Sequence, residues 1–350
     1  MVESEPGQLD SGVVTLADVA RVASVDLSTV SRVLTGDPKA RVSAATRDRI
    51  RDAADRLGYV VNANARSLVR RKTMTIGLLI PSIGGFVYAD VVRGASDSAR
   101  EKGYVLVVAD TSGGGTAEDA FHALVSEGRV DGLLIASGRL TDSLESGTMS
   151  PSRKCVVLNR QIKGGYASII EDDEQGMALG VSELLVAGHT RIACLAGPEN
   201  VDTSRRRVQG YTTSIRAAGL PVDDRYIVGA GFSEQDGFDG MTQILALSPR
   251  PTAVAIASVA AAIGALSACR ANGVTVPDDM SMVAFHDAEL AGFLSPPLTT
   301  VAMPLYELGR IAMDLLDDQL QGRHVPILTR VSSPDPELRR RQSVAPPRVV

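Results

Sequence analysis

Residues 15–36 read TLADVARVASVDLSTVSRVLTG, and this stretch constrains the fold more than any other part of the chain. Its first half places apolar side chains at helical spacing, at Leu16, Val19, Ala20 and Ala23. Such a stripe predicts a short helix with one buried face. Thr15 can cap the start of this helix, with Asp18 three residues later in the place of the usual Glu or Gln of a capping box.

A second short helix is predicted after a break at residues 24–26, where Asp26 is a good N-cap. Its apolar residues would turn inward, at Val30, Val33 and Leu34. Its outward face would then carry Leu27, Ser28, Ser31 and Arg32. Two short helices with a tight turn, the second showing small polar groups and an Arg, are typical of a helix-turn-helix. A small helical hairpin at the surface fits the same pattern.

The residues that follow favour the helix-turn-helix over the surface hairpin. Ser43 is a predicted N-cap for a third helix, which ends at Gly58 and has one apolar face, at Ile50, Ala53, Ala54 and Leu57. A basic segment comes next, LGYVVNANARSLVRRK, and then an abrupt apolar strand, TIGLLIP.

This order resembles the lactose-repressor (LacI/GalR) family of bacterial transcription regulators. Residues 15–36 match the headpiece signature of that family almost throughout, LGY…NANARSL matches its hinge, and the resemblance extends to Ala345-Pro346-Pro347. The resemblance implies a transcription regulator, and we expect it to be a repressor. Such a protein binds a palindromic operator as a dimer and is controlled by a small molecule in its core.

The charge of the chain is divided between a basic head and an acidic body. Residues 14–73 carry twelve Lys and Arg against six Asp and Glu, a net charge of +6. The remaining residues carry 24 basic and 35 acidic side chains, a net charge of −11, which gives −5 for the whole chain. This division suits contact with double-stranded DNA at one end of the protein only.

The three cysteines, Cys155, Cys194 and Cys269, have no metal-ligand spacing, so we expect buried reduced thiols, no metal and no cofactor. The first residues are acidic and polar, unlike a signal peptide. No apolar run approaches the ~20 residues that a membrane-spanning helix needs. We therefore expect a cytoplasmic, nucleoid-associated protein.

The domain organisation follows from changes in composition. We expect a disordered tail at 1–13, a helix-turn-helix headpiece at 14–58, a hinge at 59–73 and an effector-binding and dimerisation core at 74–345. In the core, continuously apolar strands alternate with helices, which predicts parallel sheets covered on both faces. The fold class is thus an all-α helix-turn-helix headpiece plus an α/β core of two lobes that resemble periplasmic binding proteins.

The two lobes come from two sets of strands. We expect strands 75–80, 105–109, 132–136 and 155–158 with helices 87–102 and 117–127 in lobe 1, and strands 168–170, 191–196, 227–228, 253–257 and 282–285 with helices 174–187, 204–218, 234–246 and 260–272 in lobe 2. Helix 304–320 would return to lobe 1, and the residues after Pro334 would form a final strand. Lobe 1 would then span about 74–161 and 302–323, and lobe 2 about 162–301 and 324–345.

The resemblance also implies which residues contact DNA. It places Leu27, Ser28 and Arg32 in the major groove, where an Arg can hold guanine with two hydrogen bonds. It places on the DNA backbone Thr15, Ser31, Arg41 and Asn62. It places in the minor groove Ala65, Arg66 and Leu68, with Leu68 as an apolar wedge that kinks the duplex. From the residues alone, Leu68 could equally pack on the core.

The effector site matches the family in part. Phe86 and Phe232 match aromatic positions over the cleft, Arg207 matches an Arg that binds the effector, and Asp172 matches a cleft-side carboxylate. Where the family commonly has a carboxamide and a carboxylate, this chain has Ser258 and His286. With Arg205 and Arg206 beside Arg207, an anionic or phosphorylated effector is one interpretation, and a sugar is another. A cleft that has lost its ligand is a third. An unperturbed His titrates near pH ~6.5, and Arg207 would favour its neutral form.

An enzyme is not expected. The run Gly113-Gly114-Gly115 lacks the spacing of a dinucleotide-binding loop, and the chain has neither HExxH nor a nucleophile elbow. The rival class is a cytoplasmic small-molecule-binding protein or enzyme with an appended helical head. The basic headpiece favours the DNA-binding regulator, which we expect to be a homodimer with helix 87–102 in its interface.

Overall fold

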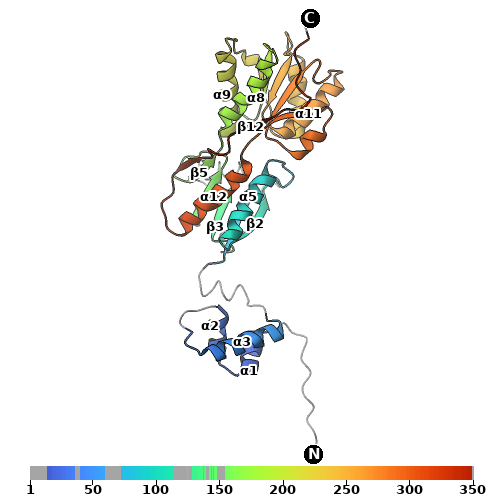
Figure 1. The fold of residues 1–350 in the computed structure, drawn as a ribbon. Helices are drawn as coiled ribbons and strands as arrows, with labels where there is room; N and C mark the ends of the chain where they lie inside the picture. The colour runs from blue at the N-terminus through green and yellow to red at the C-terminus, as the bar shows by residue number, and fades with distance from the viewer. Residues whose placement is uncertain are drawn as a thin grey trace, which may run out of the picture. The chain divides into compact units, whose positions relative to one another are not determined.

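The structure is a computed structural model that describes residues 14–35, 40–59, 72–112, 128–136 and 154–348, together with residues 124, 138, 142, 144, 146 and 147. Contacts divide the chain into two compact units, Met1–Thr73 and Met74–Val350 (Figure 1). The expected tail at 1–13, most of the expected hinge and most of the expected helix 117–127 lie outside the described residues.

The first unit contains the predicted short helices, which are α1 (Leu16–Ala23), α2 (Leu27–Thr35) and α3 (Ala44–Leu57). The N–H and hydroxyl of Thr15 donate to the carboxylate of Asp18, at 3.0 and 2.7 Å, and so cap α1. Ser43 caps α3 by accepting from the N–H of Thr46, and Gly58 ends it in a left-handed conformation. The carbonyl of Asp26 accepts the first backbone hydrogen bonds of α2, but no hydrogen bond of its carboxylate is found among the described residues.

These helices enclose a small aliphatic core. Its buried members are Val19, Ala20, Ala23, Val30, Val33, Ile50, Ala53 and Ala54. The side chain of Arg49 on α3 donates to the carbonyl of Ala23 at 2.9 Å, which satisfies the C-terminal end of α1. The packing therefore fixes α2 with its Val30 and Val33 face inward.

The first lobe of the second unit is a six-stranded parallel sheet in the order β11-β5-β4-β3-β1-β2. Its strands are β1 (Thr75–Ile80), β2 (Val105–Asp110), β3 (Gly132–Ile135), β4 (Lys154–Leu158), β5 (Ala167–Ile170) and β11 (Leu328–Arg330). Helices α5 (Tyr88–Glu101) and α12 (Leu305–Leu320) pack together and cover one face (Figure 1). Gly94 permits this close packing, because a Cβ there would lie 2.0 Å from the carbonyl oxygen of Tyr306.

The second lobe is a six-stranded sheet in the order β12-β10-β9-β8-β6-β7, parallel except for β12. Its strands are β6 (Ile192–Ala196), β7 (Ile227–Gly229), β8 (Ala253–Ile256), β9 (Ser281–Phe285), β10 (Thr299–Ala302) and β12 (Glu337–Arg339). One face is covered by α8 (Asp173–Val186) and α9 (Asp202–Ala217), and the other by α10 (Glu234–Leu245) and α11 (Val259–Ala271). Short 3₁₀ turns lie at Asp224–Tyr226 and Glu289–Phe293.

Two strands lie in a different lobe from the one expected. Residues 168–170 and 324–345 were assigned to lobe 2, whereas β5 and β11 complete the sheet of lobe 1. The N–H of Asn159 donates to Ile169, and that of Val331 donates to Ile170, so the pairing is made by backbone groups. Apolar periodicity identifies a strand but not the partner to which it hydrogen-bonds. The chain therefore crosses between the lobes after β5, after β10 and after β11.

The remaining expectations about the core concern its thiols and its helices. Cys155, Cys194 and Cys269 are free and buried, as predicted. Helix α12 packs on β3, β4 and β5 and so returns to lobe 1, as predicted. None of the described helices is long and apolar enough to cross a membrane.

Candidate functional site: an exposed helix face and a cavity between two lobes

Helix α2 exposes the side chains that were predicted to enter the major groove. Leu27 is 51% exposed although it is apolar, and Ser28 and Arg32 are also exposed. The opposite face of the helix is buried through Val30 and Val33. An exposed Leu beside an exposed Arg, on a helix fixed from behind, forms a surface that can enter a groove.

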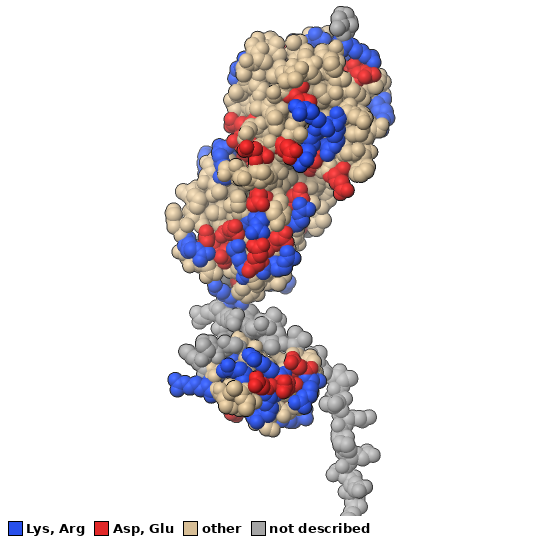
Figure 2. All heavy atoms as spheres, in the orientation of Figure 1, with Lys and Arg blue, Asp and Glu red and all other residues tan. Residues whose placement is uncertain are grey.

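The residues predicted to hold the DNA backbone differ in their surroundings. Thr15 is exposed but its hydroxyl is already used in the cap of α1. Ser31 is half-buried and its carbonyl accepts from the hydroxyl of Thr35, while Arg41 is exposed. The other predicted DNA contacts, Asn62, Ala65, Arg66 and Leu68, lie outside the described residues. Figure 2 shows Lys and Arg over much of the visible face of the headpiece with Asp and Glu among them, and both signs are mixed over the core as well.

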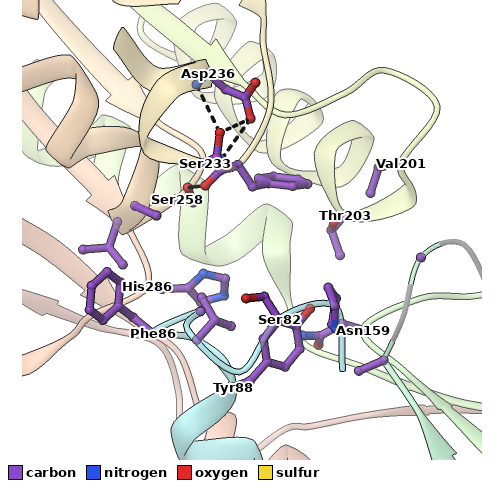
Figure 3. Close-up of a pocket in the computed structure, with 18 of the residues that line it drawn as sticks. Ser82, Phe86, Tyr88, Asn159, Val201, Thr203, Ser233, Asp236, Ser258 and His286 are labelled. Atoms are coloured by element: carbon purple, nitrogen blue, oxygen red, sulfur yellow. Dashed lines mark hydrogen bonds between the residues drawn. The ribbon is translucent and has the colours of Figure 1, made fainter. Parts of the chain in front are cut away.

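The core contains a cavity of about 560 Å³ lined by residues of both lobes (Figure 3). Its walls follow the carboxyl ends of the parallel strands, which is where α/β sheets bind ligands. Residues 81–88 follow β1 and residues 158–160 end or follow β4 in lobe 1. Residues 258–260 follow β8 and His286 follows β9 in lobe 2.

Most of the predicted effector residues line this cavity, namely Phe86, Arg207, Phe232, Ser258 and His286. Asp172 and Arg205 are not among the described residues that line it. The carboxylate of Asp172 accepts from the N–H of Gln175 at 3.0 Å and caps α8. Arg205 is exposed on α9 and donates to the carbonyl of Glu199. The structure thus gives both residues local roles at helix ends.

Arg207 is buried, with 3% exposure, and all three nitrogens of its guanidinium have neighbours. Its Nε donates to Asp173 at 2.8 Å, its Nη1 donates to the carbonyl of Ala257 at 2.7 Å, and its Nη2 lies 3.5 Å from Nε2 of His286. The guanidinium carbon lies 4.0 Å from the centre of the Phe285 ring. Arg207 is therefore a fixed wall of the cavity.

The arginine cluster does not supply the unpaired positive charge on which an anionic effector would depend. Arg206 binds the carboxylates of Asp173 and Asp202, and Asp173 also binds Arg207. Arg205 lies at the surface. The interpretation as an anion site rested on the adjacency of these residues in sequence, whereas on α9 consecutive side chains point in different directions.

His286 is neutral in this environment. Its side chain is 4% exposed, and burial, followed by the charge of Arg207, holds its pKa well below the ordinary 6.5. The expected direction of the Arg207 effect is confirmed, but burial is the larger cause. A titration of His286 between pH 6 and 8 is therefore not expected.

Ser258 and Phe232, which both line the cavity, are joined by a hydrogen bond. The Ser258 hydroxyl donates to the carbonyl of Phe232 at 3.0 Å and accepts from the N–H of Ala261, which caps α11. Gly197 leaves room for the aromatic ring, because a Cβ there would lie 2.3 Å from it. Ser258 therefore lines the cavity, and its hydroxyl also holds the Phe232 segment in place.

The sequence did not single out Asn159, Glu171 and Asp173. Asn159 follows β4 and lines the cavity, with φ of 58°. Glu171 and Asp173 flank the predicted Asp172, are almost fully buried, and face Arg207 or His286. The acidic run EDDE was a usable signal, but only the positions of Arg207 and His286 show which of its members face the site.

A helix-turn-helix unit joined to a two-lobed core with a cavity at the strand ends defines a ligand-responsive DNA-binding regulator. Residues 15–62 match the family described as bacterial regulatory proteins, lacI family, and residues 181–344 match the periplasmic binding protein-like domain. The chain is 36% identical over 312 residues to the HTH-type transcriptional repressor CytR of Escherichia coli strain K12, covering 89% of this chain and 91% of that one.

Two further comparisons agree. The chain is 37% identical over 304 residues to the ribose operon repressor of the same strain, covering 86% of this chain and 92% of that one. The crystal structure of the lac repressor dimer bound to operator and an anti-inducer superposes with a TM-score of 0.81 at 29% identity, covering 95% of this chain and 100% of that one. The protein belongs to the lacI family of bacterial regulatory proteins.

Proposed function

We propose that this protein is a cytoplasmic transcriptional repressor that binds a palindromic operator as a homodimer and responds to a small metabolite in the cavity of its core. The observation that carries the proposal is the exposed face of α2, with Leu27, Ser28 and Arg32, on a unit of net charge +6 between residues 14 and 73. The relatives CytR and the ribose operon repressor are named as repressors, and the similar lac repressor structure is a dimer on its operator.

Recognition of a palindromic operator supports the proposal of a dimer. One headpiece offers a single recognition helix, which reads only a few base pairs, whereas two heads read two half-sites. A dimer would also bring two Leu68 residues to the centre of one operator, with Asn62, Ala65 and Arg66 beside them. We propose α5 as part of the interface. Sedimentation of the full chain with and without operator tests this, and a monomer at micromolar concentration in both cases would contradict it.

The cavity supports a small uncharged polar effector. Its aromatic side chains include Phe86, Tyr88 and Phe232, which suit the apolar faces of a sugar or a planar ring. His286 Nδ1 and Asn159 Oδ1 are buried and have no hydrogen-bond partner among the residues that the structure describes. Unpartnered polar atoms are unfavourable in an empty cavity and become satisfied by a polar ligand, which favours a functional site over a degenerate one.

The decisive experiment is selection of DNA from a randomised pool with the full-length protein. We expect enrichment of an inverted repeat, and an affinity for it that falls steeply with salt, since each phosphate that is neutralised releases counterions. Enrichment of a sequence without two-fold symmetry, or an affinity independent of salt, would contradict the proposal. A thermal-stability screen of uncharged sugars and nucleosides then tests the effector.

A further inference from the structure

The two lobes are in contact on two sides of the cavity. On one side, Phe86 extends from lobe 1 and packs against the aliphatic cluster of lobe 2 that includes Val259. On the other side, the backbone N–H of Gln161 in lobe 1 donates to a carboxylate oxygen of Asp202 in lobe 2, at 3.0 Å. Figure 3 shows Phe86 and Asn159, which is two residues before Gln161, on opposite sides of the cavity. Contacts on both sides therefore hold the lobes together around it.

The Asp202 carboxylate is held in place from lobe 2. The oxygen that accepts from Gln161 also accepts from Arg206, one turn along α9. Arg206 is in turn bound by the buried carboxylate of Asp173 on α8. A second nitrogen of the Arg206 guanidinium lies 3.5 Å from the backbone carbonyl oxygen of Asn159. Lobe 2 therefore presents an acceptor and a donor to the backbone of residues 159–161, and these groups together are named the latch.

Asp202 also has a local role, since it lies in the first turn of α9, where an acidic side chain is favourable. That role needs no contact with lobe 1, whereas the hydrogen bond from Gln161 joins the lobes. The Asp202 side chain is 20% exposed, so water can replace the N–H of Gln161 when the lobes separate. A hydrogen bond that water can replace has a modest net energy, which suits reversible closure of the cavity.

The latch and the cavity share one segment of lobe 1. The side chain of Asn159 lines the cavity, and its buried Oδ1 has no hydrogen-bond partner in the part of the chain that the structure describes. The backbone N–H of Asn159 donates to Ile169 at 2.8 Å, and its φ of 58° is a left-handed conformation that Asn tolerates better than most residues. A ligand that bonds to the Asn159 side chain therefore acts on the segment that the latch holds.

We propose that the latch holds the lobes closed before any ligand binds, and that Asp202 thereby sets the fraction of molecules in which the cavity is open. The contacts of Phe86 and Asp202 must both break for the lobes to separate, because they lie on opposite sides of the cavity. A ligand that binds the closed arrangement gains apparent affinity in proportion to the closed fraction. The latch is a property of the core alone, and it is independent of the identity of the ligand and of the operator.

Exchange of the Gln161 amide hydrogen with water tests the latch, because the closed arrangement protects this hydrogen and the open one exposes it. It is followed by NMR of the full-length protein with ¹⁵N-glutamine labelling and is assigned with Gln161→Glu. We expect protection in the wild type and exchange about tenfold faster in Asp202→Ala. Phe86→Ala should accelerate this exchange from the far side of the cavity, which a purely local hydrogen bond would not allow. An unprotected Gln161 amide in the wild type, or no effect of Phe86→Ala, would overturn the latch.

The distance between the lobes gives a second measurement. The native cysteines are buried, so spin labels can be attached to cysteines introduced at two exposed positions, Lys154 of lobe 1 and Asn200 of lobe 2. Electron spin resonance of labelled full-length chains, diluted with unlabelled chains, should give longer and broader distances in Asp202→Ala than in the wild type. Asp202→Asn keeps an acceptor oxygen and should lie between the two. Identical distances in the wild type and Asp202→Ala would show that Asp202 does not hold the lobes closed.

Glu183→Ala is the matched control for Asp202→Ala. The Glu183 side chain is 15% exposed and forms an ion pair with Arg340 at 2.9 Å, so it resembles Asp202 in burial and in having an arginine partner. Both members of this pair belong to lobe 2, and the pair therefore does not join the lobes. Glu183→Ala should leave the Gln161 exchange and the distance between the lobes unchanged. An effect as large as that of Asp202→Ala would mean that any lost ion pair loosens the core, and it would contradict the latch.

Discussion

The headpiece and the cavity use their functional side chains in opposite ways. On α2 the side chains proposed to read DNA are exposed and lie within six consecutive residues, on the face opposite the buried Val30 and Val33. In the cavity, Arg207 and Ser258 are buried, come from distant segments, and are already hydrogen-bonded to other groups. The polar side chains of a surface that binds a large partner are hydrated before binding. The polar groups of a buried site have no such water, so they must form hydrogen bonds within the protein before the ligand binds.

The same contrast appears in the cores that support the two sites. The headpiece rests on a small cluster that includes Val19, Val30 and Ile50, whereas two sheets and their helices support the cavity. Because a small unit buries little apolar surface, its stability is marginal and one lost side chain is a large fraction of it.

The largest expected effect is that of Ile50→Ala. Ile50 is fully buried on α3, so its truncation should lower the free energy of unfolding of the headpiece by about 2–5 kcal/mol. Binding to every DNA sequence should be lost while ligand binding by the core remains. Calorimetry of the full chain measures this, with Val22→Ala, which is 45% exposed, as a control within about 0.5 kcal/mol. An equal loss of stability in the core would show that the two units are not independent.

Glu171→Gln should change how the stability of the core depends on pH. The pKa of Glu171 is raised from 4.5 to about 8 in the folded core, so between these values the unfolded chain releases a proton that the folded chain keeps. The free energy of unfolding of the wild type should therefore fall as the pH rises through this window, relative to the variant. The difference should reach a few kcal/mol.

Urea unfolding of both proteins at pH 5 and pH 8.5 measures that difference. The pKa values of Asp279 and Asp223 are lowered from 3.8 in the fold, so both carboxyls are ionised in the folded and the unfolded chain above pH 5 and do not contribute to the comparison. Parallel curves for wild type and variant would mean that Glu171 is ionised in the folded protein at neutral pH.

The contrast also explains what the sequence could predict. The helices of the headpiece and the exposed face of α2 follow from local spacing, because caps such as Ser43 and buried stripes such as Val30 and Val33 act within a few residues. Most strands were also identified, but β10 and β11 were not. The strand β5 was placed in the wrong lobe, because a local pattern does not show that it pairs with β4.

The cavity was predictable only in outline. Phe232 and His286, which the resemblance singled out, line the cavity, whereas the pairing of Arg206 with Asp173 was not visible in the sequence. The charge of a buried group depends on partners that are far away along the chain. This is why the three adjacent arginines suggested an anion site that the structure does not support.

Arg32→Ala should weaken operator binding by roughly 1–3 kcal/mol and relax the preference at one base pair of each half-site. The reason is that a bidentate contact to guanine is lost while contacts to phosphates remain. Arg41→Ala is the matched comparison, since Arg41 is also exposed but is proposed to contact the backbone. It should weaken binding to all sequences alike and reduce the salt slope by about 1. Uniform loss with Arg32→Ala, measured on a set of single-base operator variants, would place Arg32 on the backbone instead.

The smallest expected effect is that of Thr15→Ala, and it separates two roles of one hydroxyl. Thr15 was predicted to contact the DNA backbone, but its hydroxyl donates to Asp18 and is the first cause that lowers the pKa of Asp18 from 3.8 to about 2. If the cap is its main role, Thr15→Ala should lower the stability of the headpiece by about 1 kcal/mol. The pKa of Asp18 should also rise toward its ordinary value. A phosphate contact alone would move neither quantity. NMR titration of the Asp18 carboxyl in the absence of DNA therefore decides between the roles, with Thr15→Ser as the control that keeps the hydroxyl. An unchanged pKa of Asp18 together with weaker operator binding would assign Thr15 to the DNA.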